Sequence, residues 1–160
     1  MVLHKPAGEV ASAAVRFGLR EVIAHWNRCL DAQDVAGMAD VSSPDIVLVH
    51  EDVVFDGADV VARFAAVHGG SATVARRTHV NHLQAWQQPG RIVTRSLMMV
   101  VQLVPDTSPF GAGAAAPGWV GYAEDEFDVS AGRPVFVSRR FVRWGGEVLS
   151  AFPSAAAVDA

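Results

Sequence analysis

The stretch Arg77-Thr78-His79-Val80-Asn81-His82-Leu83, in the middle of the chain, decides the expected fold. It opens a run of residues that is typical of a strand, and it places an imidazole where that run begins. The residues before it predict helices and a short hairpin, and the residues after it predict three more strands. We therefore expect one curved sheet with helices across its open face, and His79 near the middle of the cavity between them.

Composition and charge exclude several classes of protein. The chain has 160 residues, of which 51% are hydrophobic and 19% charged, as in a well-packed single domain. Its net charge of -4 and pI near 5.8 disfavour nucleic-acid binding, which needs a basic surface. A single cysteine, Cys29, excludes an intramolecular disulfide, and no apolar run is long enough to span a bilayer. We expect a cytoplasmic protein that binds neither nucleic acid nor membranes.

The first half of the chain predicts three helices and a small hairpin. Apolar residues recur every three or four positions over residues 11–31, which predicts an amphipathic helix of about six turns. Asp34 is placed to cap a second, short helix, and residues 58–67 return to helical spacing. Between these helices, residues 45–50 predict a buried strand with which residues 51–55 are expected to pair.

The second half of the chain is β. Turn clusters rich in Gly, Pro and Gln or Ser separate four strand-like segments, residues 73–86, 91–104, 119–129 and 134–144. The loop over residues 105–118 is either a lid or a surface insertion. The sequence therefore predicts an α+β, cone-shaped fold in which three N-terminal helices pack on a strongly curved, mostly antiparallel sheet and enclose a pocket.

Helix breakers and small residues mark the ends of the domain. Pro6 and Gly8 interrupt helix, so residues 1–10 are expected to form an irregular arm. Residues 11–152 are expected to form a single domain, and residues 153–160 a flexible tail.

Three short motifs resemble one known group of proteins. The segment Trp26-Asn27-Arg28-Cys29-Leu30-Asp31-Ala32-Gln33-Asp34 is similar to the first-helix motif of scytalone dehydratase and the SnoaL-like polyketide cyclases. These proteins belong to the nuclear transport factor 2-like superfamily of cone-shaped α+β folds. The Arg77-Thr78-His79 start of the long strand and the ending Arg143-Trp144-Gly145 also resemble that group. With the order of elements, the resemblance covers most of the chain.

The resemblance implies positions for the site. Asp31 matches the family's pocket carboxylate, and His79 matches its first catalytic histidine, with which the carboxylate forms an acid/base pair. His50 falls where the dehydratases place a water-orienting tyrosine, and Ser96 where they carry a second histidine. Their pocket asparagine has no clear match, although Asp125 lies nearby. Since the tyrosines are missing, the resemblance implies a related reaction rather than scytalone dehydration itself.

Periodicity leaves two points open. Strand alternation puts His79, Asn81 and Leu83 on one face, which we expect to line the cavity, although a histidine bonded to backbone is the alternative. Helical projection places Asp31 roughly 140° from the centre of the apolar stripe, which favours solvent exposure. The resemblance instead implies that Asp31 turns inward.

An imidazole that titrates near neutrality and contacts a carboxylate can move a proton beside a carbonyl or onto a leaving hydroxyl. We therefore expect a cofactor-independent lyase, isomerase or cyclase that acts on a small hydrophobic polyketide-like or terpenoid substrate. His79 is the expected acid/base and Asp31 its orienter, with His50 and Asn81 as polar helpers. Further substrate-binding residues are expected at Trp26, Ser96, Met98, Tyr122 and Asp125.

Other functions and partners follow from the same residues. A non-catalytic ligand-binding module of this fold is one alternative, and an epoxide hydrolase that uses Asp31, Arg95 and Asp125 is another. No metal site is expected, because His79 and His82 fall on opposite strand faces. We expect a homodimer or homotrimer that assembles through the exposed sheet face.

Overall fold

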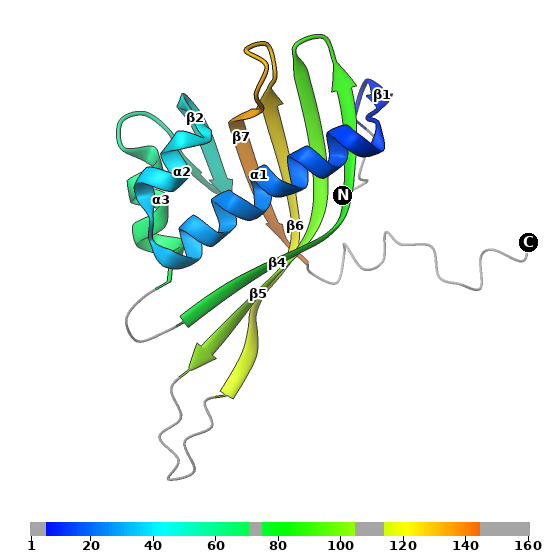
Figure 1. The fold of residues 1–160 in the computed structure, drawn as a ribbon. Helices are drawn as coiled ribbons and strands as arrows, with labels where there is room; N and C mark the ends of the chain where they lie inside the picture. Colours follow the sequence, from blue (N-terminus) through cyan, green and yellow to red (C-terminus); the bar gives the residue numbers. More distant parts are fainter. Residues whose placement is uncertain (1–5, 71–74, 105–113, 145–160) are drawn as a thin grey trace, which may run out of the picture.

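Helices cover one face of a curved sheet. The computed structural model describes residues 6–70, 75–104 and 114–144, and within these ranges it forms one seven-stranded sheet in the order β1-β4-β5-β6-β7-β2-β3 (Figure 1). Strands β2 and β7 are parallel and the other neighbours are antiparallel. The predicted α+β fold with a mostly antiparallel, curved sheet is confirmed.

The elements follow the predicted order. The helices are α1 (Ala13–Ala32), α2 (Val35–Asp40) and α3 (Val60–His68). The strands are β1 (Glu9–Val10), β2 (Ser42–His50), β3 (Val53–Phe55), β4 (Ala75–Gln88), β5 (Arg91–Val104), β6 (Ala114–Asp128) and β7 (Val135–Arg143). Within the described ranges, no helix combines the length and apolar character that a membrane span requires.

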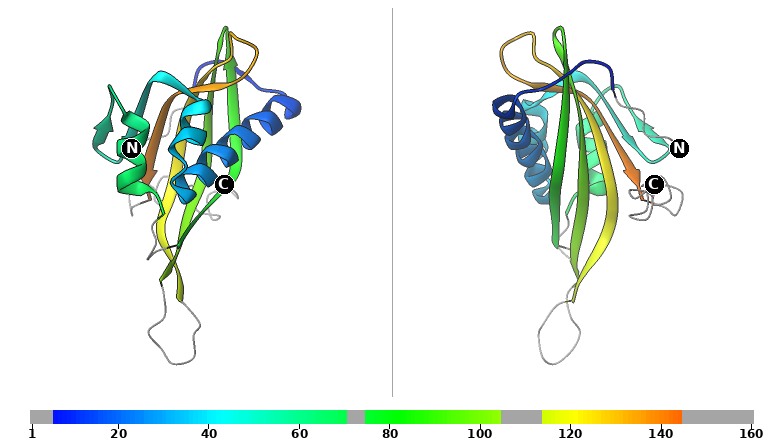
Figure 2. Two further views of the ribbon diagram at one scale, coloured as in Figure 1. Left: turned by 60° about the vertical axis from the view of Figure 1, so that its left-hand side comes forward. Right: turned by 90° about the vertical axis from the view of Figure 1, so that its right-hand side faces the viewer.

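Helix α1 runs diagonally across the concave face of the sheet (Figures 1 and 2). It begins where the Ser12 hydroxyl accepts a hydrogen bond from the backbone N–H of Val15, and it ends at Gln33, which adopts the left-handed conformation. The predicted cap of the next helix is confirmed, since the Asp34 carboxylate accepts a 3.0 Å hydrogen bond from the backbone N–H of Gly37. These caps fix the sharp turn between α1 and α2.

Two boundaries differ from the predictions. Residues 9–10 form β1 and pair with β4 at residues 86–87, so they are not an irregular arm. The exposed edge of β4 explains this difference, because it offers unpaired backbone groups that a short strand can satisfy. The predicted loop is also shorter, since β6 begins at Ala114. Residues 105–113 and the predicted tail, 153–160, lie outside the described residues.

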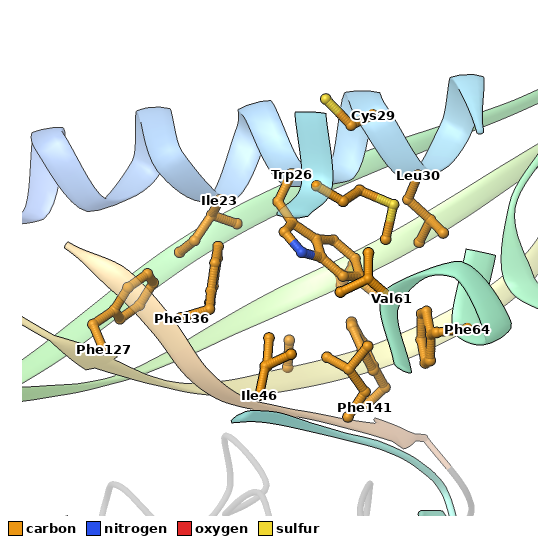
Figure 3. Packing of buried hydrophobic residues seen from close by; sticks show 14 of the residues in the cluster. Ile23, Trp26, Cys29, Leu30, Ile46, Val61, Phe64, Phe127, Phe136 and Phe141 are labelled. Atoms are coloured by element: carbon orange, nitrogen blue, oxygen red, sulfur yellow. The ribbon is translucent and has the colours of Figure 1, made fainter. Parts of the chain in front are cut away.

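Trp26 lies at the centre of the core (Figure 3). Its ring is fully buried and packs against those of Phe64, Phe136 and Phe141, with centroids 5.8–6.2 Å apart. The indole N–H donates a 3.2 Å hydrogen bond to the Ser42 hydroxyl, so the polar edge of the ring is satisfied. Trp26 therefore ties α1 to α3, β2 and β7.

Cys29 is expected to resist thiol reagents while the protein is folded. Its side chain is buried, and both burial and the neighbouring Asp34 carboxylate raise the pKa of the thiol. Since the thiolate is the reactive form, a disulfide reagent at pH 8 should label the folded protein far more slowly than the guanidinium-unfolded chain. Equal labelling rates, followed by absorbance, would contradict this burial.

Candidate functional site

A cavity of about 180 Å³ lies between the C-terminal ends of α1 and α3 and the strands β5, β6 and β7. The apolar part of its wall is formed by Leu30, Phe64, Met98, Val100, Trp119 and Phe141. Its polar lining side chains are His50, His68, Gln102 and Arg143. A more open groove of about 610 Å³ between α2, β2 and the start of α3 has no histidine or arginine among its lining residues. The smaller cavity, called the histidine pocket below, is the better candidate site.

Two imidazole rings face each other in the histidine pocket. His50 ends β2 and His68 ends α3, and their rings stack with centroids 4.1 Å apart and planes inclined by 22°. Both side chains are half-buried, and Phe64 packs on His68 at 4.5 Å. Because two imidazolium charges this close repel each other, the doubly charged state of the pair is disfavoured. Such a pair offers a proton donor beside a proton acceptor.

Glycines make room for the pocket wall. A Cβ on Gly121 would lie 2.1 Å from the carbonyl oxygen of Val142 and 2.5 Å from the Trp119 ring. Gly69 similarly follows α3 at a point where a Cβ would lie 2.6 Å from the carbonyl oxygen of Ala65. The missing side chain at Gly121 lets the Trp119 ring lie across β6. The missing side chain at Gly69 lets the end of α3 approach the carbonyl oxygen of Leu30 in α1.

Arg143 borders the open end of the pocket. Its Nε donates a 2.8 Å hydrogen bond to Oε1 of Glu51, and the two side chains are 55% and 44% exposed. This hydrogen bond lowers the pKa of the Glu51 carboxyl. Glu51 itself adopts a left-handed backbone conformation, with φ of 56°.

The structure does not form the predicted pair of Asp31 and His79. Asp31 is half-buried, and its carboxylate accepts 2.7 Å hydrogen bonds from both the backbone N–H and the hydroxyl of Thr78. Thr78 therefore faces α1. Since neighbouring strand residues point to opposite faces, His79 points away and is exposed. Asp31 thus turns toward β4, but it is not among the described residues that line the histidine pocket, and the prediction that His79 lies in the cavity beside it is wrong.

Two other predicted pocket residues also lie on the outer face of the sheet. Asn81 is exposed and pairs across the sheet with Leu97, which pairs in turn with Tyr122. Tyr122 is buried, but its neighbour Ala123 takes the inward position. The epoxide hydrolase set is not assembled, because Arg95 lies on this outer face and bonds Glu124 at 2.6 Å.

The remaining predicted residues face inward. His50 and Met98 line the histidine pocket, whereas Trp26 and Ser96 are buried outside its lining. Asp125 is fully buried and accepts hydrogen bonds of 2.9 and 3.2 Å from Arg139. Burial raises the pKa of the Asp125 carboxyl, although the Arg139 guanidinium opposes that rise.

Arg139 is a fully buried cation in the core. Its guanidinium lies 4.3 Å from the Trp26 ring centroid and 4.4 Å from that of Phe136, and it donates a 3.2 Å hydrogen bond to the Asn27 side chain. Among the described residues, no three His, Cys, Asp or Glu side chains converge as metal ligands.

Sequence reasoning missed His68. The residue lies four positions after Phe64, so it continues the buried face of α3, whereas Val67 is 66% exposed. The helical spacing of Val61, Phe64 and His68 was the signal that points to it.

Comparisons with known proteins identify the fold. No protein-family model and no curated protein matches the sequence. Among solved structures, ActVI-ORFA from Streptomyces coelicolor superposes with a TM-score of 0.69 and 20% identity, covering 82% of this chain and 98% of that one. A protein from Catenulispora acidiphila in complex with S-DNPA superposes with a TM-score of 0.66 and 19% identity, and the match covers 88% of this chain and 100% of that one.

An NTF2-like protein with a cystatin-like fold from Novosphingobium aromaticivorans superposes with a TM-score of 0.68 at 14% identity, and the match covers 86% of this chain and 88% of that one. The order of the elements, the curved sheet and the helices on its concave face agree with this likeness. The chain therefore has the NTF2-like, cystatin-like α+β fold that the resemblance implied.

Proposed function

We propose that the protein is a cofactor-independent acid/base enzyme that acts on a small apolar substrate in the histidine pocket. The observation that carries the proposal is the stacked pair of His50 and His68 in a cavity with apolar walls. Apolar surroundings strengthen electrostatic interactions, and imidazole exchanges protons near neutral pH.

The chemistry follows from the two protonation states of the pair. The neutral ring removes a proton from the carbon next to a substrate carbonyl, and the charged ring donates a proton to the carbonyl oxygen or to a leaving hydroxyl. Elimination, isomerisation and cyclisation all use these two transfers. The pocket thus supports a lyase, isomerase or cyclase of the kind that the resemblance implied.

Cavity size limits the substrate. An apolar cavity of roughly 150 Å³ accommodates benzene, and the histidine pocket measures about 180 Å³. The enclosed part of the substrate is therefore about one ring in size, and a larger polyketide-like or terpenoid molecule extends out of the open end. The complex with S-DNPA is a precedent for a ligand bound to a protein of this fold.

The test is turnover by histidine variants. Replacing His68 or His50 by Ala removes one member of the pair, and we expect turnover of a ring-sized enolisable ketone to fall by about 100-fold or more. His25 is the matched control, because its ring lies near Cys29 and Gly37, outside the pocket lining. Unchanged turnover in both pocket variants would exclude this mechanism.

A ligand-binding module is the second candidate. The observation that favours it is the absence of contact between Asp31 and His79, the pair that the resemblance implied. Saturable binding of ring-sized ligands without any product would support the module over the enzyme.

A further inference from the structure

We infer that the natural ligand of the histidine pocket is a carboxylic acid, and that its carboxylate binds Arg143 at the open end in place of Glu51. The inference rests on the proposed function only in placing the ligand in this pocket. It concerns binding, so it stands or fails separately from turnover.

Arg143 is positioned to meet the outer end of a ligand in the pocket. It pairs across the sheet with Gly121, which pairs with Met98, and this row of residues faces the inside of the sheet. Met98 and Arg143 both line the pocket. A ligand whose apolar ring lies against Met98 would therefore have Arg143 at its outer end.

The guanidinium of Arg143 has more hydrogen-bond donors than Glu51 uses. Arginine presents five N–H donors in a planar fork that matches a carboxylate. Glu51 takes the hydrogen bond from Nε, and no other described residue accepts one from Arg143. The side chain is 55% exposed, so a ligand can reach it from solvent.

The charge of the lining also favours an acidic ligand. Among the described residues that line the pocket are His50, His68 and Arg143, but no aspartate or glutamate. A site lined by groups of one sign attracts ligands of the opposite sign. The apolar walls hold the ring of such a ligand, and the open end favours its negative charge.

Glu51 can be displaced from Arg143 at little cost in stability. Exposed ion pairs contribute little to stability, and the Glu51 side chain is 44% exposed. A ligand carboxylate that is held by the apolar pocket competes for the same cation at a high effective concentration. Glu51 therefore acts as a replaceable counter-ion that keeps Arg143 oriented in the free protein.

The experiment is a calorimetric titration of the full chain with a matched pair of probes, phenylacetate and the neutral phenylacetamide. We expect phenylacetate to bind about tenfold more tightly or better. Arg143→Gln should reduce that preference to less than about twofold, and Glu51→Gln should strengthen phenylacetate binding while leaving phenylacetamide unchanged. The matched control is Arg140→Gln, which removes the same charge from an exposed position opposite Glu124 in the sheet.

Equal affinities of the two probes, a preference that survives in Arg143→Gln, or no saturable binding of phenylacetate would each overturn the inference. The His50→Ala and His68→Ala variants separate the two proposals. A retained preference for the acid together with unchanged turnover in both variants would support the ligand class and exclude the acid/base mechanism.

Discussion

Replacing Asp125 by Asn is expected to lower the free energy of unfolding by about 3–5 kcal/mol, because it leaves a buried guanidinium without its counter-charge. Arg139 and Asp125 are both fully buried, and their side chains form two hydrogen bonds of 2.9 and 3.2 Å. In the interior, water cannot replace the lost carboxylate. Urea denaturation at pH 7, followed by circular dichroism, measures the effect.

The neighbouring residue supplies the control. Glu124 lies on the opposite face of β6 and pairs with Arg95 at 2.6 Å, where the two side chains are 36% and 16% exposed. Glu124→Gln should therefore cost less than about 1 kcal/mol. The double variant Asp125→Leu/Arg139→Met should regain most of the loss, since apolar groups of similar volume can replace a buried ion pair. Equal losses for Asp125→Asn and Glu124→Gln would contradict the burial of the pair.

The second large effect is expected at Asp31. Replacing it by Ala removes two charge-assisted hydrogen bonds of 2.7 Å to Thr78 and should cost about 2–4 kcal/mol. These bonds fasten the end of α1 to β4. Strand β1 pairs with β4 only at residues 86–87, so Thr78 lies in a part of β4 that β1 does not reach. Thermal and urea unfolding of the variant measure the loss.

A double-mutant cycle distinguishes the two possible partners of Asp31. Thr78→Val should couple energetically with Asp31→Ala, whereas His79→Ala should be additive with it and should itself change stability by less than about 0.5 kcal/mol. His79→Ala should also leave turnover unchanged under the proposed mechanism. Strong coupling between Asp31 and His79, or loss of turnover in His79→Ala, would restore the role that the resemblance implied.

The error at β4 shows what a strand pattern cannot specify. The alternation of strand residues correctly places Thr78 and His79 on opposite faces of the sheet. It does not specify which of these two polar residues faces the helices. The contact with Asp31 decides this, and that contact joins residues far apart in sequence. The register also shifts between Asn81 and Gln84, so that both residues face outward and alternation cannot be extended through the whole strand.

Elements and their order were predictable because they depend on local patterns. The cap at Asp34, the spacing along α1 and the turn before α3 all act within a few residues. The site was less predictable because its two imidazoles come from β2 and α3 and meet only in the folded chain. His50 was proposed on resemblance, and His68 was overlooked because the helical spacing was followed only to residue 67.

The parallel pairing of β2 with β7 has a consequence for biosynthesis. His50 lies beside Phe141 in this pair, although one strand is near the start of the chain and the other is the last element described. A ribosome releases the chain from its N-terminus, so β2 and the helices α1, α2 and α3 are synthesised before β7. Strand β2 can therefore join the sheet only after β7 has been released. Contacts between such distant segments also slow folding, because a long loop must close first. We therefore expect β2 to remain without its partner until β7 has been synthesised, and the histidine pocket to be among the last features to form.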